Sequence, residues 1–243
     1  MVVADKLAGL GTLAAGIAHE INSPLQIITG KSESLKRRLE RDQLDLDNLD
    51  SDLESINRNG WRVARIVRSL LDYAHPISGE IEQFEINALI SDTLLLIEHQ
   101  LRTWSNITVM TDLASDLPPL YCSGEEVSRL LINLLTNARD AMPDGGEVAI
   151  RTCRNQADDG IILEIADNGQ GIPEEALPNI FNPFFTTKAV GQGTGLGLFI
   201  VHGIVQSLGG EISVTSQVDK GTTFTVSLPP DPLPAADIKH GRY

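Results

Sequence analysis

The stretch Gly191-Gln192-Gly193-Thr194-Gly195-Leu196-Gly197-Leu198 decides the fold of this 243-residue chain. Every second residue in it is glycine up to Gly197, and an apolar run continues to residue 208. Glycine lets the bare backbone approach a ligand closely, and the N-terminus of a helix favours anions. We therefore predict a phosphate-binding loop that leads into a helix over residues 196–208.

This loop does not match the commoner nucleotide-binding loops. It lacks the Lys-Ser/Thr ending of a P-loop, and no strand followed by G-x-G-x-x-G opens a dinucleotide-binding unit. Other segments must therefore complete the pocket.

A pair of asparagines supplies one such segment. Asn133 and Asn137 lie four residues apart in the apolar stretch 130–138, so on a helix both point the same way, one turn apart. A buried amide needs a partner, and a hydrated Mg²⁺ that carries ATP phosphates would supply one. The alternative is that neighbouring backbone satisfies both amides.

A second polar segment follows the alternating and apolar run 161–166, which predicts a strand. Asp167 stands at the end of this strand and can accept a hydrogen bond from the amino group of adenine. Gly169 and Gly171 allow the chain to turn beneath the base. The alternative is an ordinary Asp-Asn-Gly turn.

The N-terminal region predicts a long helix with one apolar stripe. His19 is displaced from this stripe by about 160° at ~100° per residue and should face solvent, where another domain can reach it. Pro24 removes a backbone hydrogen bond and should bend the helix just past the histidine. The stripe consists of Leu7, Leu10, Ala14, Ile17, Ile21, Pro24 and Ile28.

A second heptad pattern follows the polar break at residues 41–43 and ends at Pro76. The two helices should form an antiparallel hairpin. One hairpin cannot bury both stripes well, so we expect a homodimer with a four-helix bundle. The second stripe consists of Leu46, Leu49, Leu53, Ile56, Gly60, Val63, Val67, Leu70 and Ala74.

Four motifs, taken in order, resemble the gyrase, heat-shock chaperone, histidine kinase and MutL superfamily. They are the N box at 133–137, the G1 box at 167–171, the F box at 181–188 and the G2 box at 191–198. The resemblance implies that Asn137 holds Mg²⁺, that Asp167 reads adenine, and that 181–193 is a lid over ATP. Lys188 of this lid either touches phosphate or is merely solvated. The nucleotide-binding residues implied are Asn133, Asn137, Asp167, Gly169, Gly171, Thr187, Lys188, Gly193, Thr194, Gly195, Leu196 and Gly197.

Within that superfamily, the N-terminal segment His19-Glu20-Ile21-Asn22-Ser23-Pro24-Leu25 resembles the H box of sensor histidine kinases. The resemblance implies that His19 is the phosphoacceptor and Glu20 the base. A carboxylate that holds one ring N–H makes the other ring nitrogen a better nucleophile. Ser23 stands where members that also dephosphorylate their partner commonly have Thr or Asn. This leaves phosphatase activity open, since Ser23 or the amide of Asn22 can substitute.

The class of enzyme depends on Asn133. Gyrase-like ATPases carry a glutamate at this position to activate water, and an amide cannot take that proton. A kinase is therefore favoured, with a receiver aspartate of a separate response regulator as the final acceptor. A dimeric signalling scaffold with a degenerate nucleotide site is the alternative. A serine kinase of the anti-sigma-factor type would lack the histidine-bearing hairpin of residues 1–76.

The rest of the sequence indicates the domain organisation, the class of partner and the cellular location. We expect a helical hairpin at 1–76, an α/β sandwich that binds ATP at 80–230, and a tail at 231–243. The net charge of −14 disfavours nucleic acid. The two cysteines form no redox or metal motif, and no apolar run is long enough to span a membrane, which fits a cytoplasmic location with a sensor region absent from this chain. The expected elements of the sandwich are helices at 86–104 and 124–142 and strands at 107–112, 147–154, 161–166, 211–216 and 222–228.

Overall fold

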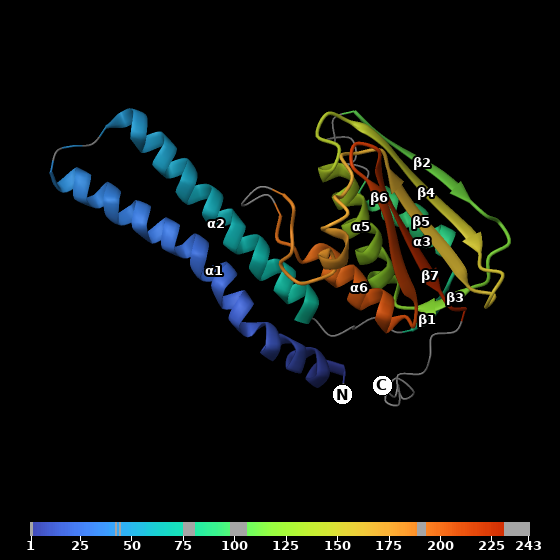
Figure 1. The fold of residues 1–243 in the computed structure, drawn as a ribbon. Helices are drawn as coiled ribbons and strands as arrows, with labels where there is room; N and C mark the ends of the chain where they lie inside the picture. The colour runs from blue at the N-terminus through green and yellow to red at the C-terminus, as the bar shows by residue number, and fades with distance from the viewer. Residues whose placement is uncertain are drawn as a thin grey trace. The chain divides into compact units, whose positions relative to one another are not determined.

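The computed structural model describes residues 2–41, 43, 45–74, 81–97, 106–188 and 193–230 (Figure 1). The chain divides into two compact units. One unit contains Met1–Pro76 and Asn182–Leu196, and the other contains Ile77–Phe181 and Gly197–Tyr243.

Two helices, α1 (Val2–Glu40) and α2 (Leu46–Ala74), form the hairpin of the first unit. Ion pairs Glu20–Arg62 and Lys31–Asp52 show that the helices run antiparallel. The residue further along α1, Lys31, pairs with the residue nearer the start of α2, Asp52. Pro24 lies inside α1 and is buried. The predicted helices and their polar break are confirmed, while the bend at Pro24 stays a prediction. The predicted side chains Leu7, Leu10, Ala14, Leu46 and Ala74 lie outside the side chains that the structure describes.

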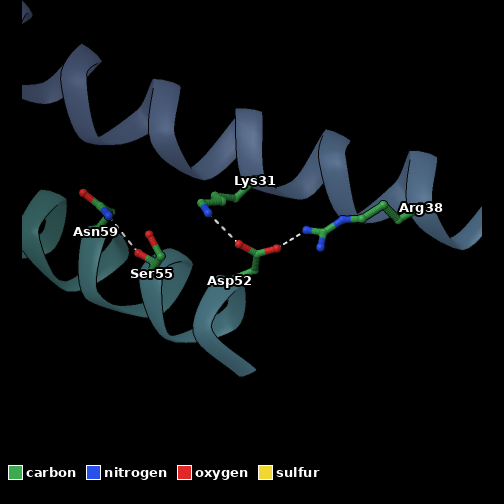
Figure 2. A network of polar contacts seen from close by, with 5 residues as sticks. All are labelled: Lys31, Arg38, Asp52, Ser55 and Asn59. Atoms are coloured by element: carbon green, nitrogen blue, oxygen red, sulfur yellow. Dashed lines mark hydrogen bonds and ion pairs between the residues drawn. The ribbon is translucent and has the colours of Figure 1, made fainter. Parts of the chain in front are cut away.

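A charged cluster lies between the two helices (Figure 2). Asp52 of α2 is buried, with a relative exposure of 5%. It accepts a hydrogen bond from Lys31 Nζ at 2.5 Å and another from Arg38 Nη2. These two bonds, that of Lys31 first, hold the pKa of the Asp52 carboxyl below its usual range against the opposing effect of burial. A buried carboxylate is tolerated here because it is paired on both oxygens.

The second unit is built on a five-stranded sheet in the order β2-β4-β5-β7-β6. Only the pair β2–β4 is parallel within it, and the other three pairs are antiparallel. The strands are β2 (Ile107–Leu113), β4 (Gly146–Arg154), β5 (Ile161–Asp167), β6 (Glu211–Gln217) and β7 (Gly221–Leu228). A separate short pair joins β1 (Glu82–Phe84) to β3 (Leu120–Cys122).

Helices α3 (Ile86–Leu96), α5 (Gly124–Asp140) and α6 (Gly197–Ser207) cover one face of this sheet (Figure 1). Alternate strand residues such as Val148, Leu163 and Val226 are buried beneath them, as expected where one face of a sheet packs on a core. A short 3₁₀ helix spans Leu177–Asn179. The predicted α/β sandwich with one covered face is confirmed.

Two details differ from the sequence prediction. The helix expected at 86–104 is helical only to Leu96, and residues 98–105 lie outside the described part of the chain. Strands β1 and β3 were not predicted, because each is three residues long and too short to show an alternating pattern.

Candidate active site

The polar notch of α5 lies against the start of α6. A Cβ added to Gly197, the first residue of α6, would stand 3.2 Å from Asn133 Oδ1 and 3.8 Å from Asn137 Nδ2. Glycine at this position therefore lets the N-terminus of α6 approach both amides. The structure thus brings the predicted asparagine pair and Gly197 of the predicted glycine loop together.

The two amides differ in their partners. Asn133 Nδ2 donates to the carbonyl of Arg129 at 2.8 Å, one turn earlier on α5. Asn137 Nδ2 is buried and has no hydrogen-bond partner among the residues that the structure describes. A buried polar atom without a partner is uncommon in folded proteins, so Asn137 has bonding capacity for a ligand beside a helix N-terminus that favours anions.

The carboxylate of Asp167 lies at the end of β5, as predicted. Its Oδ1 accepts hydrogen bonds from the backbone N–H of Gly169 at 2.9 Å and of Thr222 at 3.3 Å. Its Oδ2 receives none from the residues that the structure describes. Burial raises the pKa of Asp167 above its ordinary value, and the two backbone bonds oppose that rise. The site thus holds a half-buried carboxylate with one oxygen fixed and the other available.

The turn after Asp167 needs glycine at two positions. Gly171 has φ +68°, and a Cβ there would meet the backbone of Gln217 at the end of β6. A Cβ on Gly169 would lie 2.5 Å from the carbonyl oxygen of Ala141, just past α5. Side chains at either position would therefore push the turn off α5 and β6.

The loop segment Asn182–Leu196 belongs to the other unit and has its own internal contacts. A Cβ on Gly193 would lie 2.7 Å from Thr186 Oγ1 and 3.2 Å from Lys188 Cδ. Gly195 has φ +66° and passes against the backbone of Phe184, whose own φ is +66°. Thr187 is exposed, Leu196 is buried, and its N–H lies 3.4 Å from Thr194 Oγ1. Residues 189–192 of the predicted lid lie outside the described residues.

His19 lies on α1 and is exposed, as the heptad pattern predicted. Its ring makes no hydrogen bond or ion pair with any residue in the described ranges. The neighbouring Glu20 is half-buried and bonds Arg62 of α2, with 2.8 Å between Glu20 Oε2 and Arg62 Nη2.

Three contacts around the candidate site were missing from the sequence prediction: Arg62 at Glu20, Thr222 at Asp167, and Asn168, whose Oδ1 accepts the N–H of Glu147 at 2.8 Å. The first two join residues far apart in the chain, so no local motif contains them. Asn168 lies in the predicted turn, but its partner Glu147 is 21 residues away in the chain, so the turn motif did not indicate this contact either.

Among the described residues, no group of three or more His, Cys, Asp or Glu side chains could hold a metal ion. A magnesium ion here would take most of its oxygen ligands from phosphates and water, as Mg²⁺ usually does in nucleotide sites. The amide of Asn137 fits such an ion, because rotation of the amide exchanges its nitrogen for an oxygen.

Two family models match the chain. Residues 10–79 match the His Kinase A (phospho-acceptor) domain, and residues 123–232 match the histidine kinase-, DNA gyrase B- and HSP90-like ATPase family. Sensor kinase CckA of Brucella abortus is 35% identical over 242 residues. The chain belongs to the sensor histidine kinase family. The match covers 94% of this kinase and 25% of CckA, while sensor histidine kinase ZraS of Escherichia coli K12 is 36% identical over 93% of this kinase and 46% of ZraS.

Solved structures agree with this assignment. Histidine kinase ThkA, in a crystal structure with response regulator protein TrrA, matches 95% of this kinase and 64% of that chain with a TM-score of 0.71 and 28% identity. The nucleotide-free catalytic domain of ThkA matches 63% of this kinase with a TM-score of 0.55 and 31% identity. This kinase spans less than half the length of curated relatives such as CckA and ZraS. In the described part of the chain, no helix is both long and apolar enough to cross a membrane.

Proposed function

We propose that this histidine kinase phosphorylates His19 with ATP and then passes the phosphoryl group to an aspartate of a response regulator. The observation that carries the proposal is Asn133. The residue one turn before Asn137 is an amide bonded to the backbone of Arg129, so it cannot act as a base for water. The phosphoryl group therefore needs another nucleophile, and His19 is exposed and unpartnered within the described residues.

The proposed reaction has two steps. A lone pair of the neutral His19 imidazole attacks the γ-phosphorus, the bond from that phosphorus to the β,γ-bridging oxygen breaks, and ADP leaves. Glu20 takes the proton from the other ring nitrogen. An aspartate carboxylate of the receiver then attacks the phosphorus, the N–P bond breaks, and the proton returns to the ring.

We assign the nucleotide-binding roles as follows. Asp167 accepts a hydrogen bond from adenine through Oδ2, and Asn137 presents its amide oxygen to Mg²⁺. When bound, Mg²⁺ neutralises charge on the phosphates. The remaining nucleotide-binding residues are Asn133, Gly169, Gly171, Thr187, Lys188, Gly193, Thr194, Gly195, Leu196 and Gly197.

We also propose a homodimer. Large apolar side chains remain exposed on α2, with relative exposures of 50% for Leu53, 41% for Val67 and 55% for Leu71, and Leu25 and Leu39 of α1 are 41% and 65% exposed. Leu53, Val67 and Leu71 recur at heptad spacing on one side of α2, as in a coiled-coil seam. A second hairpin would bury these side chains in a four-helix bundle. Sedimentation of Leu53→Glu/Leu71→Glu against the wild type tests this, and a double variant that remains dimeric would refute it.

The proposal assigns residues 1–76 to dimerisation and phosphotransfer, 80–230 to ATP binding, and 231–243 to a tail outside the described residues. A reaction that uses ATP and a receiver partner places this part of the protein in the cytoplasm.

The phosphorylation is tested with γ-labelled ATP and Mg²⁺, using the wild type beside His19→Gln. Acid-labile, alkali-stable label on the wild type alone is expected, since a phosphohistidine is a phosphoramidate. Label that persists in His19→Gln would refute the assignment. Tight ATP binding without any label would favour the alternative of a signalling scaffold.

A further inference from the structure

An ionic contact between α1 and α2 lies at Glu20, the residue next to His19 in the chain. Arg62 Nη2 lies 2.8 Å from Glu20 Oε2, and the side chains are 15% and 31% exposed. This is shorter and less exposed than a typical surface ion pair, whose contribution is small. The contact also fixes a carboxylate directly adjacent in sequence to His19.

The bond leaves a defined part of Glu20 free. Arg62 uses Oε2, and Oε1 takes no hydrogen bond from the residues that the structure describes. His19 likewise has no partner there. A carboxylate held by one oxygen can still accept a ring N–H through the other, and it has fewer orientations in which to do so.

We propose that Arg62 is a positioning residue for the phosphorylation of His19: it anchors Glu20 by one oxygen and offsets its charge. This inference rests on the proposed function. Arg62 contacts Glu20 and makes no hydrogen bond to His19 in the described part of the chain, so its effect on the reacting ring is exerted through Glu20.

Charge gives Arg62 a second effect. The γ-phosphate of ATP is anionic, and an uncompensated carboxylate beside His19 would repel it as it approaches. A guanidinium 2.8 Å from the carboxylate makes the pair nearly neutral at the distance of an incoming phosphate. Lysine would keep the positive charge and lose the planar guanidinium that orients a carboxylate.

Arg58 supplies a matched control. It lies one turn before Arg62 on α2, is exposed, and makes no ion pair in the described part of the chain. Arg58→Ala therefore removes the same charge from the same helix without touching Glu20.

The experiment measures the rate constant of autophosphorylation over a range of ATP concentrations, together with thermal unfolding. Arg62→Ala should lower the rate at saturating ATP by about 10- to 100-fold. The loss is smaller than the whole contribution of a general base, because Glu20 is still present but no longer held in place. The ATP concentration that gives half the maximal rate should stay within about twofold, because the nucleotide site is unchanged. Arg62→Lys should recover part of the rate, and Arg58→Ala should match the wild type.

A double-mutant cycle separates positioning from a general effect on the fold. If Arg62 acts through Glu20, adding Arg62→Ala to Glu20→Gln should change the rate by less than about twofold. A rate for Arg62→Ala equal to that of the wild type would overturn the inference, as would losses that multiply in the double variant. A wild type that takes up no label at His19 would instead refute the proposed function itself.

Discussion

Asp167→Asn separates nucleotide recognition from folding, because the two oxygens of this carboxylate do different things. Oδ1 accepts two backbone hydrogen bonds, from Gly169 and Thr222, and an asparagine oxygen can accept both. The available oxygen becomes an NH₂ group, which is a donor like the amino group of adenine. Two donors cannot bond each other, so the variant should bind adenine weakly. It should still fold, because the backbone hydrogen bonds to Oδ1 are kept.

The expected magnitudes follow from these contacts. A hydrogen bond to a charged group contributes about 1.5–3 kcal/mol, so Kd for ATP should rise by about 10- to 150-fold. The free energy of unfolding should stay the same or increase at neutral pH. The fold raises the pKa of Asp167, which means that it disfavours the charged form that asparagine removes.

The measurements are calorimetric titration with ATP and thermal unfolding of both proteins. Inosine triphosphate provides the control, because its 6-oxygen is an acceptor: Asp167→Asn should bind it more tightly than ATP, and the wild type should show the opposite order. Affinity of the variant for ATP within about twofold of the wild type would refute the reasoning. So would weakened binding accompanied by a large fall in Tm.

The same carboxyl predicts a pH dependence. In the proposed complex Asp167 Oδ2 accepts a hydrogen bond from adenine, protonation weakens that acceptor, and the pKa of Asp167 is raised. ATP affinity of the wild type should therefore fall as the pH drops through this raised pKa, beginning above the pH at which an ordinary aspartate protonates. The contribution of Asp167 to folding stability runs the other way: it is lost as the pH rises through the same window. The Asp167→Asn protein, titrated in parallel, accounts for protonation of ATP itself.

Four further predictions concern stability and reactivity. Gly171→Ala should lower the free energy of unfolding by more than about 1 kcal/mol, because φ is +68° and a Cβ meets backbone. Gly203→Ala in α6, where a Cβ meets nothing within 4 Å, should raise it by about 0.5–1 kcal/mol. In native protein Ellman's reagent should modify the exposed Cys153 and spare Cys122, which is buried and has its pKa raised to about 11, by burial first and by a neighbouring glutamate second. Reaction of both thiols at equal rates would contradict that burial. Because the pKa of Asp52 is lowered, wild-type stability should fall as the pH drops through that folded pKa, and an Asp52→Asn protein whose stability has the same acid dependence would count against it.

The sequence predicted the parts of the fold that repeat with a regular period. The heptads placed both helices of the hairpin and the exposure of His19, and alternation placed β4, β5 and β7. Strands β1 and β3 were not predicted, because a strand of three residues is too short to show an alternating pattern. Helix α3 ends at Leu96, and the part of the helix predicted at 98–104 lies outside the described residues, so it stays a prediction.

The site was predictable where its residues lie in contiguous motifs, as for Asn133, Asn137 and Asp167. The partners that fix those residues come from other elements. Thr222 reaches Asp167 through the pairing of β5 with β7, and Arg62 reaches Glu20 across the hairpin. Long-range contacts of this kind depend on the register between paired strands or packed helices, which cannot be derived from a single sequence.

Ion pairs at two levels of the hairpin set the axial register of α1 against α2. Glu20–Arg62 and Lys31–Asp52 lie eleven residues apart on α1 and ten apart on α2, about 16 Å and 15 Å at ~1.5 Å per residue. Sliding one helix by a single turn, about 5.4 Å, would separate Arg62 from Glu20 and would disrupt the two-sided pairing of Asp52 with Lys31 and Arg38. The height of His19 along the hairpin is therefore fixed by charge as well as by packing, and a motion that moves His19 must keep the helices in register while it turns or tilts them.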